Sequence, residues 1–166
     1  IKQTVPLPDE IIVIGDGDTD GSSQYAESAG ATVYRFPRPG GPGRARNLSA
    51  SKATSDLLFF IDADVTVPGN VIERVRDVFV GEAGVAAIIG SYDDQPGELN
   101  FLSQYRNLLH HYVHQHGREE ASTFWGACGA IRREVFLAMG GFDETYLKPS
   151  IEDIELGYRL TRAGHR

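Results

Sequence analysis

The sequence predicts an α/β domain in which a mainly parallel sheet is covered by helices on both faces. Two observations lead to this fold class: short apolar runs alternate with stretches of helical periodicity, and Gly and Asp cluster where the apolar runs end. The 166 residues, 41% of them hydrophobic and 23% charged, suit one folded domain over residues 1–166.

The expected elements follow one another in strand and helix order. Strands are expected at residues 10–14, 31–36, 56–61, 85–89 and 122–131, the last of them interrupted by glycines. Helices are expected at residues 22–29, 44–53, 71–80, 100–116, 134–139 and 151–163. Ligands bind such sheets at the carboxyl ends of the strands, so the polar turns there are the first candidate sites.

The helix expected over residues 100–116 is amphipathic, and its outer face is expected to be rich in histidine. His110 and His114 lie one turn apart, but no Cys or acidic residue is in register with them. A polar helix face is therefore favoured over a zinc site. The helix is also a candidate border of the acceptor site or of a membrane surface.

Composition excludes several classes of protein. A net charge of −7 argues against a nucleic-acid partner, since such proteins carry a basic surface. The single cysteine, Cys128, permits no internal disulfide and fits a reducing compartment. No apolar run reaches the roughly 18 residues of a membrane span, and no signal-peptide pattern opens the chain. We expect a cytoplasmic protein, with the membrane surface as a second location.

In the segment IDADV, Asp62 and Asp64 follow a nearly all-apolar strand. If that strand continues, the two carboxylates face the same way about 6.6 Å apart, and their repulsion costs about 2.5 kcal/mol at an effective dielectric of about 20. A divalent cation or a hydrogen-bonding loop would offset this cost. A solvated acidic loop is the alternative, but the position after a central strand favours Mn²⁺ or Mg²⁺, which can also bridge a diphosphate.

Two further segments offer polar groups near strand ends. Asp16 lies where a carboxylate can accept a hydrogen bond from a base edge or a ribose hydroxyl. Residues 39–47 (PGGPGRARN) lack the Gly-Lys-Ser/Thr of a P-loop, so we reject an ATPase loop of that kind. The arginines of this segment can assist an anionic nucleotide at a helix N-terminus, although a solvated basic turn fits equally well.

The last helix begins with adjacent acids, Glu152 and Asp153. Ser150 and Asp153 have the spacing of a capping box, which would give Asp153 a purely structural role. A carboxylate here equally suits a general base at a pocket rim. In the preceding stretch, rich in glycine and aromatic residues, we assign Phe124 and Trp125 to the pocket wall. Trp125 and Gly126 are also expected to contact substrate.

Taken together, these segments resemble family 2 glycosyltransferases of the GT-A (Rossmann-like) fold over nearly the whole chain. EIIVIGDGDTDGS is similar to the family's strand followed by D-D-G-S-T-D-G-T, with Asp16 at its second Asp. GRARN is similar to the family's A-R-N segment and IDADV to its D-x-D motif. GGFDE and IEDIELGYRL are similar to G-G-F-D-E and E-D-x-E-L-G-Y-R-L, which is the most specific of these matches.

The resemblance implies a role for each matching residue. Substrate-binding residues would be Asp16 at the nucleotide base, Arg46 and Asn47 at the border of the donor site, and Asp62, Trp125, Gly126 and Glu152. Asp62 and Asp64 would hold the metal, Mn²⁺ or Mg²⁺, and Asp153 would be the catalytic base. Donor binding would fall to residues 1–95 and acceptor binding with catalysis to residues 96–166.

The implied reaction transfers a sugar from a nucleoside-diphosphate sugar, with UDP expected, to a hydroxyl of a glycan or lipid-linked acceptor with inversion. The resemblance places this in cell-envelope polysaccharide synthesis. The family's usual first strand, V-x-V-x-I-P-x-x-N-E, is absent before Pro8, and its usual segment after Arg166 is also absent, so we expect a domain cut short at both ends.

Two rival functions remain. The first is a non-catalytic scaffold that binds a nucleotide or metal without transferring a sugar. The second is a nucleotidyltransferase, which shares the sheet and the acidic metal site but releases pyrophosphate. An Asp153→Asn change discriminates the first rival, since it would alter transfer and would leave a scaffold unaffected.

Overall fold

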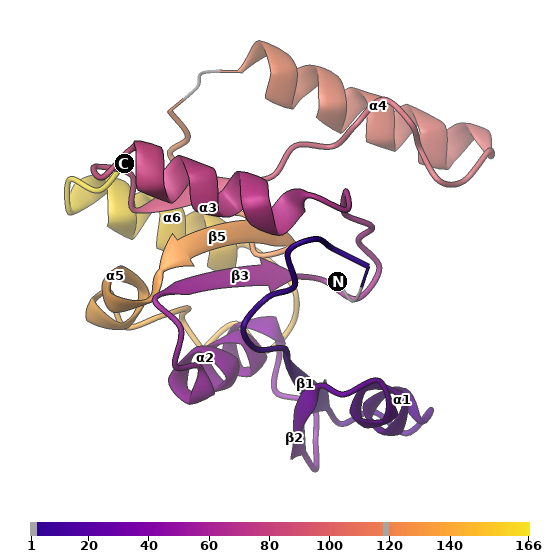
Figure 1. The fold of residues 1–166 in the computed structure, drawn as a ribbon. Coiled ribbons are helices and arrows are strands. Elements are labelled where there is room, and N and C mark those ends of the chain that lie inside the picture. Colours follow the sequence, from indigo (N-terminus) through magenta and orange to yellow (C-terminus); the bar gives the residue numbers. More distant parts are fainter. Residues whose placement is uncertain (1–2, 118–119) are drawn as a thin grey trace.

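The computed structural model describes residues 3–117 and 120–166, and it confirms the predicted alternation of strands and helices (Figure 1). The strands are β1 (Ile12–Asp16), β2 (Thr32–Phe36), β3 (Leu57–Ile61), β4 (Ala87–Ile89) and β5 (Cys128–Arg132). The helices are α1 (Ser22–Ser28), α2 (Pro42–Lys52), α3 (Val71–Gly81), α4 (Phe101–His116), α5 (Arg133–Ala138) and α6 (Glu152–Arg162).

The strands form two hydrogen-bonded ladders within this α/β architecture. β1 and β2 pair in parallel, and β3, β5 and β4 form a three-stranded sheet with β5 in the middle. β5 runs antiparallel to both of its neighbours, so β3 and β4 run in the same direction as each other. Hydrophobic patterning reports burial but not strand direction, which is why the reversed strand could not be read from the sequence.

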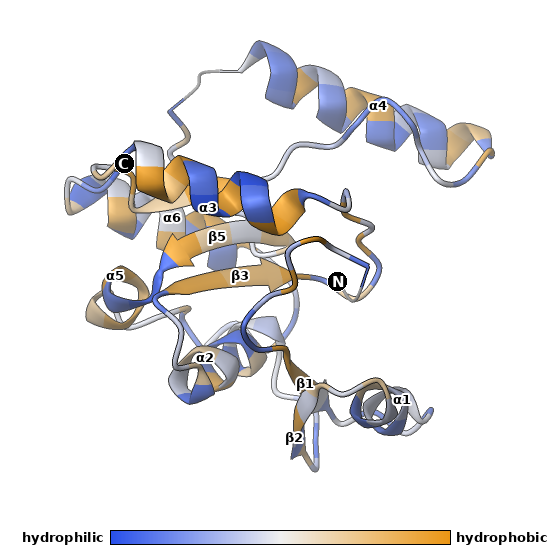
Figure 2. Ribbon diagram, viewed as in Figure 1, coloured by the Kyte–Doolittle hydropathy of each residue, from blue (hydrophilic) through white to orange (hydrophobic). Residues whose placement is uncertain are grey.

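Helices cover both faces of the three-stranded sheet because its strands alternate their apolar side chains between the two faces. On one face, Leu58 and Phe60 pack with residues of α2, α5 and α6, and the Phe60 ring lies 5.3 Å from that of Phe136. On the other face, Leu57 and Phe59 pack against α3. Figure 2 shows β3 as hydrophobic along its length, as a strand buried on both faces must be.

The ends of β1 and β3 determine where three candidate carboxylates lie. β1 ends at Asp16, two residues later than expected, so this carboxylate belongs to the strand end itself. β3 ends at Ile61, and Asp62 to Val65 form a turn closed by a hydrogen bond from the Val65 N–H to the Asp62 carbonyl, 3.1 Å. β3 thus ends where it was expected to end, and the condition under which Asp62 and Asp64 would face the same way is not met, since the chain bends away immediately after Ile61.

α4 lies apart from the rest of the fold (Figure 1). We expected its histidine-rich face to point outward, and this expectation is wrong. His111 Nδ1 donates to the Tyr92 carbonyl at 2.7 Å, and the His114 ring lies 4.5 Å from that of Trp125. His110, His111 and His114 therefore face the body of the protein, whereas His116 stacks on the exposed Tyr112. Among the described residues, no helix has both the length and the apolar character that crossing a bilayer requires.

Candidate active site

Arg46 joins two carboxylates from distant parts of the chain. This residue of α2 donates to Asp62 Oδ1 at 2.7 Å, in the turn after β3, and lies 3.4 Å from Glu152 Oε1 at the start of α6. The Arg46 side chain is 14% exposed and that of Glu152 only 5% exposed, so their charges lie out of bulk water. The fold thus gathers Arg46, Asp62 and Glu152, separated by up to 106 positions, at one place.

Gly126 makes room for the Arg46 guanidinium. A Cβ built on Gly126 would lie 2.7 Å from Arg46 Cζ, which is closer than real carbon contacts allow. Beside it, Trp125 belongs to a group of aromatic rings with Tyr92 and two histidines of α4, and the Tyr92 ring lies 5.4 Å from that of Trp125. Both residues border the site, and direct contact of either with substrate stays a prediction.

Asp62 and Asp64 are the predicted metal-binding residues, and carboxylate oxygens are the ligands that a hard divalent cation prefers. Asp64 is exposed in the turn, and Asp62 keeps 43% of its side chain exposed although one of its oxygens is paired with Arg46. Among the described residues, no three or more side chains of His, Cys, Asp or Glu gather to hold a metal. Two carboxylates fit Mn²⁺ or Mg²⁺ when phosphate oxygens and water complete the coordination.

Asp153 lies in the first turn of α6, directly after the buried Glu152. Its carboxylate accepts only a local hydrogen bond, from the Ile154 N–H at 2.8 Å, and the residue is partly exposed. The capping-box alternative is wrong, because the helix is preceded by Ile151, which makes no side-chain cap. Asp153 thus directly follows Glu152, which forms a cluster with Arg46 and Asp62 (the Arg46 cluster), and its role as a base stays a prediction.

Glu152 was expected to contact substrate, but both of its oxygens are engaged within the protein. Oε1 faces Arg46 and Oε2 accepts the Ser150 N–H at 2.9 Å. The visible function of Glu152 is to hold Arg46 in place, and direct contact with substrate stays a prediction.

Asp16 binds the glycine-rich segment that precedes α2. Its carboxylate accepts the Gly40 N–H at 2.9 and 3.1 Å and the Gly41 N–H at 3.0 Å. Gly41 has φ +93, and a Cβ there would lie 2.7 Å from the Tyr146 carbonyl oxygen, so this close approach of backbones needs glycine. Asp16 thus holds the start of α2, and its contact with the nucleotide base remains a prediction.

Asn47 also has a structural partner, Phe142, whose ring centroid lies 5.4 Å from Arg46 Cζ. Its side-chain amide donates to the Phe142 carbonyl and accepts the Phe142 N–H, both at 2.8 Å. It lines an open hollow of about 450 Å³ between α2 and α5 that contains neither Asp62 nor Asp153. We therefore place the active site at the Arg46 cluster rather than at this hollow, and a role for Asn47 at the donor border is untested.

Sequence reasoning missed the residues that support the site. Gly40 and Gly41 donate their backbone N–H groups to Asp16, and Tyr92 packs its ring between Trp125 and His110. Paired glycines before a helix are a signal of close backbone approach, and this signal was available in residues 37–43. Nothing in the pattern around Tyr92 distinguishes it from other loop residues.

A turn bearing two aspartates after an apolar strand, next to a helix that starts with paired acids, is the arrangement of a GT-A glycosyltransferase domain. The sequence model of glycosyl transferase family 2 matches residues 1–140. The chain therefore belongs to glycosyl transferase family 2.

Two curated relatives show the extent of the similarity. The chain is 28% identical to succinoglycan biosynthesis protein ExoA of Rhizobium meliloti, over 97% of this chain and 51% of that protein. It is 31% identical to the pre-mycofactocin glycosyltransferase of Mycobacterium tuberculosis, over 94% of this chain and 34% of that protein. The chain thus spans about half or less of the length of these relatives.

Solved structures confirm the GT-A fold. The mannosyltransferase PcManGT from Pyrobaculum calidifontis, in complex with GDP-Man and Mn²⁺, matches with a TM-score of 0.71 at 21% identity, over 99% of this chain and 47% of that one. Glucosyl-3-phosphoglycerate synthase from Mycobacterium tuberculosis, in complex with UDP, matches with a TM-score of 0.56 at 26% identity, over 82% and 51%. At 21% identity, the first of these likenesses carries the fold alone.

Proposed function

We propose that this protein transfers a sugar from a nucleoside-diphosphate sugar to an acceptor hydroxyl. The observation that carries the proposal is the meeting of Arg46, Asp62 and Glu152 beside Asp153. These residues combine a cation for phosphate, carboxylates for a metal and a base for a hydroxyl within a domain of glycosyl transferase family 2.

Asp62 and Asp64 would hold Mn²⁺ or Mg²⁺ against the diphosphate of the donor. When bound, the cation stabilises negative charge on the departing nucleoside diphosphate. Arg46 orients Asp62 through the 2.7 Å ion pair and keeps a positive charge next to the carboxylates. Mn²⁺ in the complex of the Pyrobaculum mannosyltransferase supports this choice of metal.

Asp153 would accept the proton of the acceptor hydroxyl as that oxygen bonds to the anomeric carbon. Its free side-chain oxygen and partial exposure suit proton transfer at a pocket rim. Attack from the face opposite the leaving diphosphate inverts the configuration of the sugar. We propose a glycan or lipid-linked acceptor, in the synthesis of cell-envelope polysaccharide, as the name of the Rhizobium relative suggests.

UDP is our proposed nucleotide. The Mycobacterium synthase with a TM-score of 0.56 was solved with UDP, whereas the Pyrobaculum enzyme was solved with GDP-Man, so the two neighbours bound different nucleotides. UDP-sugars are therefore the first donors to test and GDP-mannose the second.

Product analysis distinguishes this function from its rivals. Incubation with UDP-glucose, Mn²⁺ and a panel of glycan and lipid-linked acceptors, followed by chromatography of the nucleotides, should release UDP as the sugar passes to an acceptor hydroxyl, and EDTA should abolish the release. In a separate incubation with UTP and glucose 1-phosphate, formation of UDP-glucose with release of pyrophosphate would identify a nucleotidyltransferase instead. The absence of any released nucleotide, from UDP-sugars and GDP-mannose alike, would leave the scaffold function.

A further inference from the structure

The polar face of α4 is the one that docks on the protein. Asn107 Nδ2 donates to the Asp93 carbonyl at 2.8 Å, and Gln115 Nε2 donates to Ser91 Oγ at 2.9 Å. His110 stacks on Tyr92 with ring centroids 5.3 Å apart. The helix is thus held to residues 91–93 by hydrogen bonds and ring stacking on its polar side. Its apolar side does not take part in these contacts.

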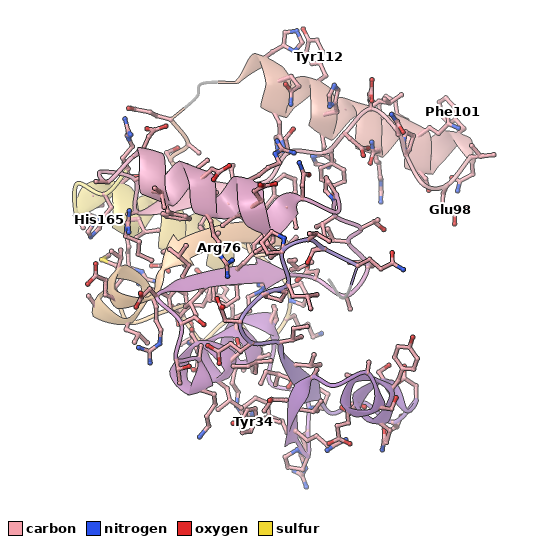
Figure 3. All side chains as sticks on the ribbon, in the orientation of Figure 1. Tyr34, Arg76, Glu98, Phe101, Tyr112 and His165 are labelled. Atoms are coloured by element: carbon pink, nitrogen blue, oxygen red, sulfur yellow. The ribbon has the colours of Figure 1, made fainter. Side chains whose placement is uncertain are left out.

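The apolar face of α4 points away from the body of the protein. Figure 3 shows the Phe101 and Tyr112 side chains, near the two ends of the helix, projecting from its outer side. Its seven residues each keep between 43% and 83% of their surface exposed, namely Phe101, Leu102, Tyr105, Leu108, Leu109, Tyr112 and Val113. No residue of α4 is buried.

This orientation reverses the usual one, in which an amphipathic helix turns its apolar stripe toward the core. At about 100° of rotation per residue, the seven apolar positions cover an arc of about 140°. Two helices that pack along each other bury a narrower apolar stripe than this arc. One helix from a second copy would therefore leave part of the apolar face of α4 in water. A broad apolar surface suits the arc better.

The charge of α4 also differs from that of the rest of the chain. The helix has no Asp or Glu, and its only formal charge at neutral pH is Arg106. The chain has 16 Lys and Arg and 23 Asp and Glu, so with +1 on α4 the other residues carry −8. Immersing α4 therefore desolvates no carboxylate, and Arg106, next to the apolar arc, is placed to meet an anionic headgroup.

We propose that the apolar face of α4 docks in the interface of an anionic lipid bilayer, with the helix axis parallel to the membrane plane. Phe101, Tyr105 and Tyr112 then lie among the headgroups, where aromatic side chains are favoured. The polar side of α4 contacts Trp125, and the next residue, Gly126, lies against Arg46. Docking would therefore hold the proposed catalytic site close to the membrane surface. This inference does not rest on the proposed sugar transfer.

Co-sedimentation with vesicles tests the docking. The protein should sediment with vesicles of phosphatidylcholine and phosphatidylglycerol. A double variant, Leu109→Glu and Tyr112→Glu, should bind these vesicles at least about tenfold more weakly, since it brings two carboxylates into the apolar face. The matched control is Val80→Glu, which adds a carboxylate at a residue of α3 that is 84% exposed and should sediment like the wild type.

Thermal unfolding of each variant checks that the fold is retained. Titration with UDP tests the proposed function independently, so a failure of membrane docking can be told from a failure of the donor site. Wild-type protein that stays in the supernatant, or a double variant that still sediments, would overturn the proposal. A concentration-dependent dimer that the same double variant dissociates would assign the face to a second copy and would equally overturn it.

Discussion

Replacing Asp153 with asparagine should slow sugar transfer by about 10²- to 10⁴-fold, because a general base contributes about that much to the rate. The amide keeps the shape of the side chain and its local hydrogen bond with the Ile154 N–H, but it cannot accept a proton from the acceptor. Nucleotide binding should be unchanged. The measurements are initial rates of UDP release in the presence of acceptor and calorimetric titration of UDP.

Asp77→Asn is the matched control, since Asp77 is an exposed carboxylate on α3 outside the proposed site. Its transfer rate should equal that of the wild type. If Asp153→Asn retains more than about a tenth of the wild-type rate, a loss smaller than general-base catalysis supplies, another group accepts the proton.

Replacing Arg46 with alanine should lower the free energy of unfolding by about 3–5 kcal/mol, because it leaves a buried carboxylate without its cation. Glu152 is only 4% exposed, and its other hydrogen-bond donor is the Ser150 N–H. The same change frees Asp62 from its ion pair. Chemical denaturation gives the free energy of unfolding directly.

The double variant Arg46→Met and Glu152→Gln is the control for this interpretation. It removes both charges of the buried pair, so it should recover most of the stability that Arg46→Ala loses. If Arg46→Ala costs less than about 1 kcal/mol, the pair behaves like an exposed salt bridge and the cluster is not held as described.

Much of the fold was predictable because burial leaves a pattern in the sequence. A strand over residues 56–61 was expected from its nearly all-apolar composition, and β3 is packed against helices on both faces. Its expected central position is wrong, because β5 lies in the middle of the three-stranded sheet. The direction of β5 was not predictable, because apolar residues look the same in parallel and antiparallel strands. The prediction of which face of α4 points outward was wrong for a related reason: periodicity identifies an apolar face but does not show what covers it.

The positions of the acidic residues of the candidate site could be predicted from the sequence, but the contacts that join them could not. The patterns around Asp62 and Asp153 located both residues at the ends of elements, as the structure has them. The ion pair between Arg46 and Glu152 joins residues 106 positions apart, and a single sequence contains no signal for such a contact. Asp16 shows the same limit, since its partners, Gly40 and Gly41, belong to a distant loop.

Calorimetric titration of UDP, with and without Mn²⁺, tests the donor site at Asp62 and Asp64 most directly. We expect binding that requires Mn²⁺, disappears with EDTA and is lost in Asp64→Ala, while the fold, measured by thermal unfolding, is unchanged because Asp64 is exposed. Binding of equal strength without metal, or undiminished in Asp64→Ala, would contradict the account.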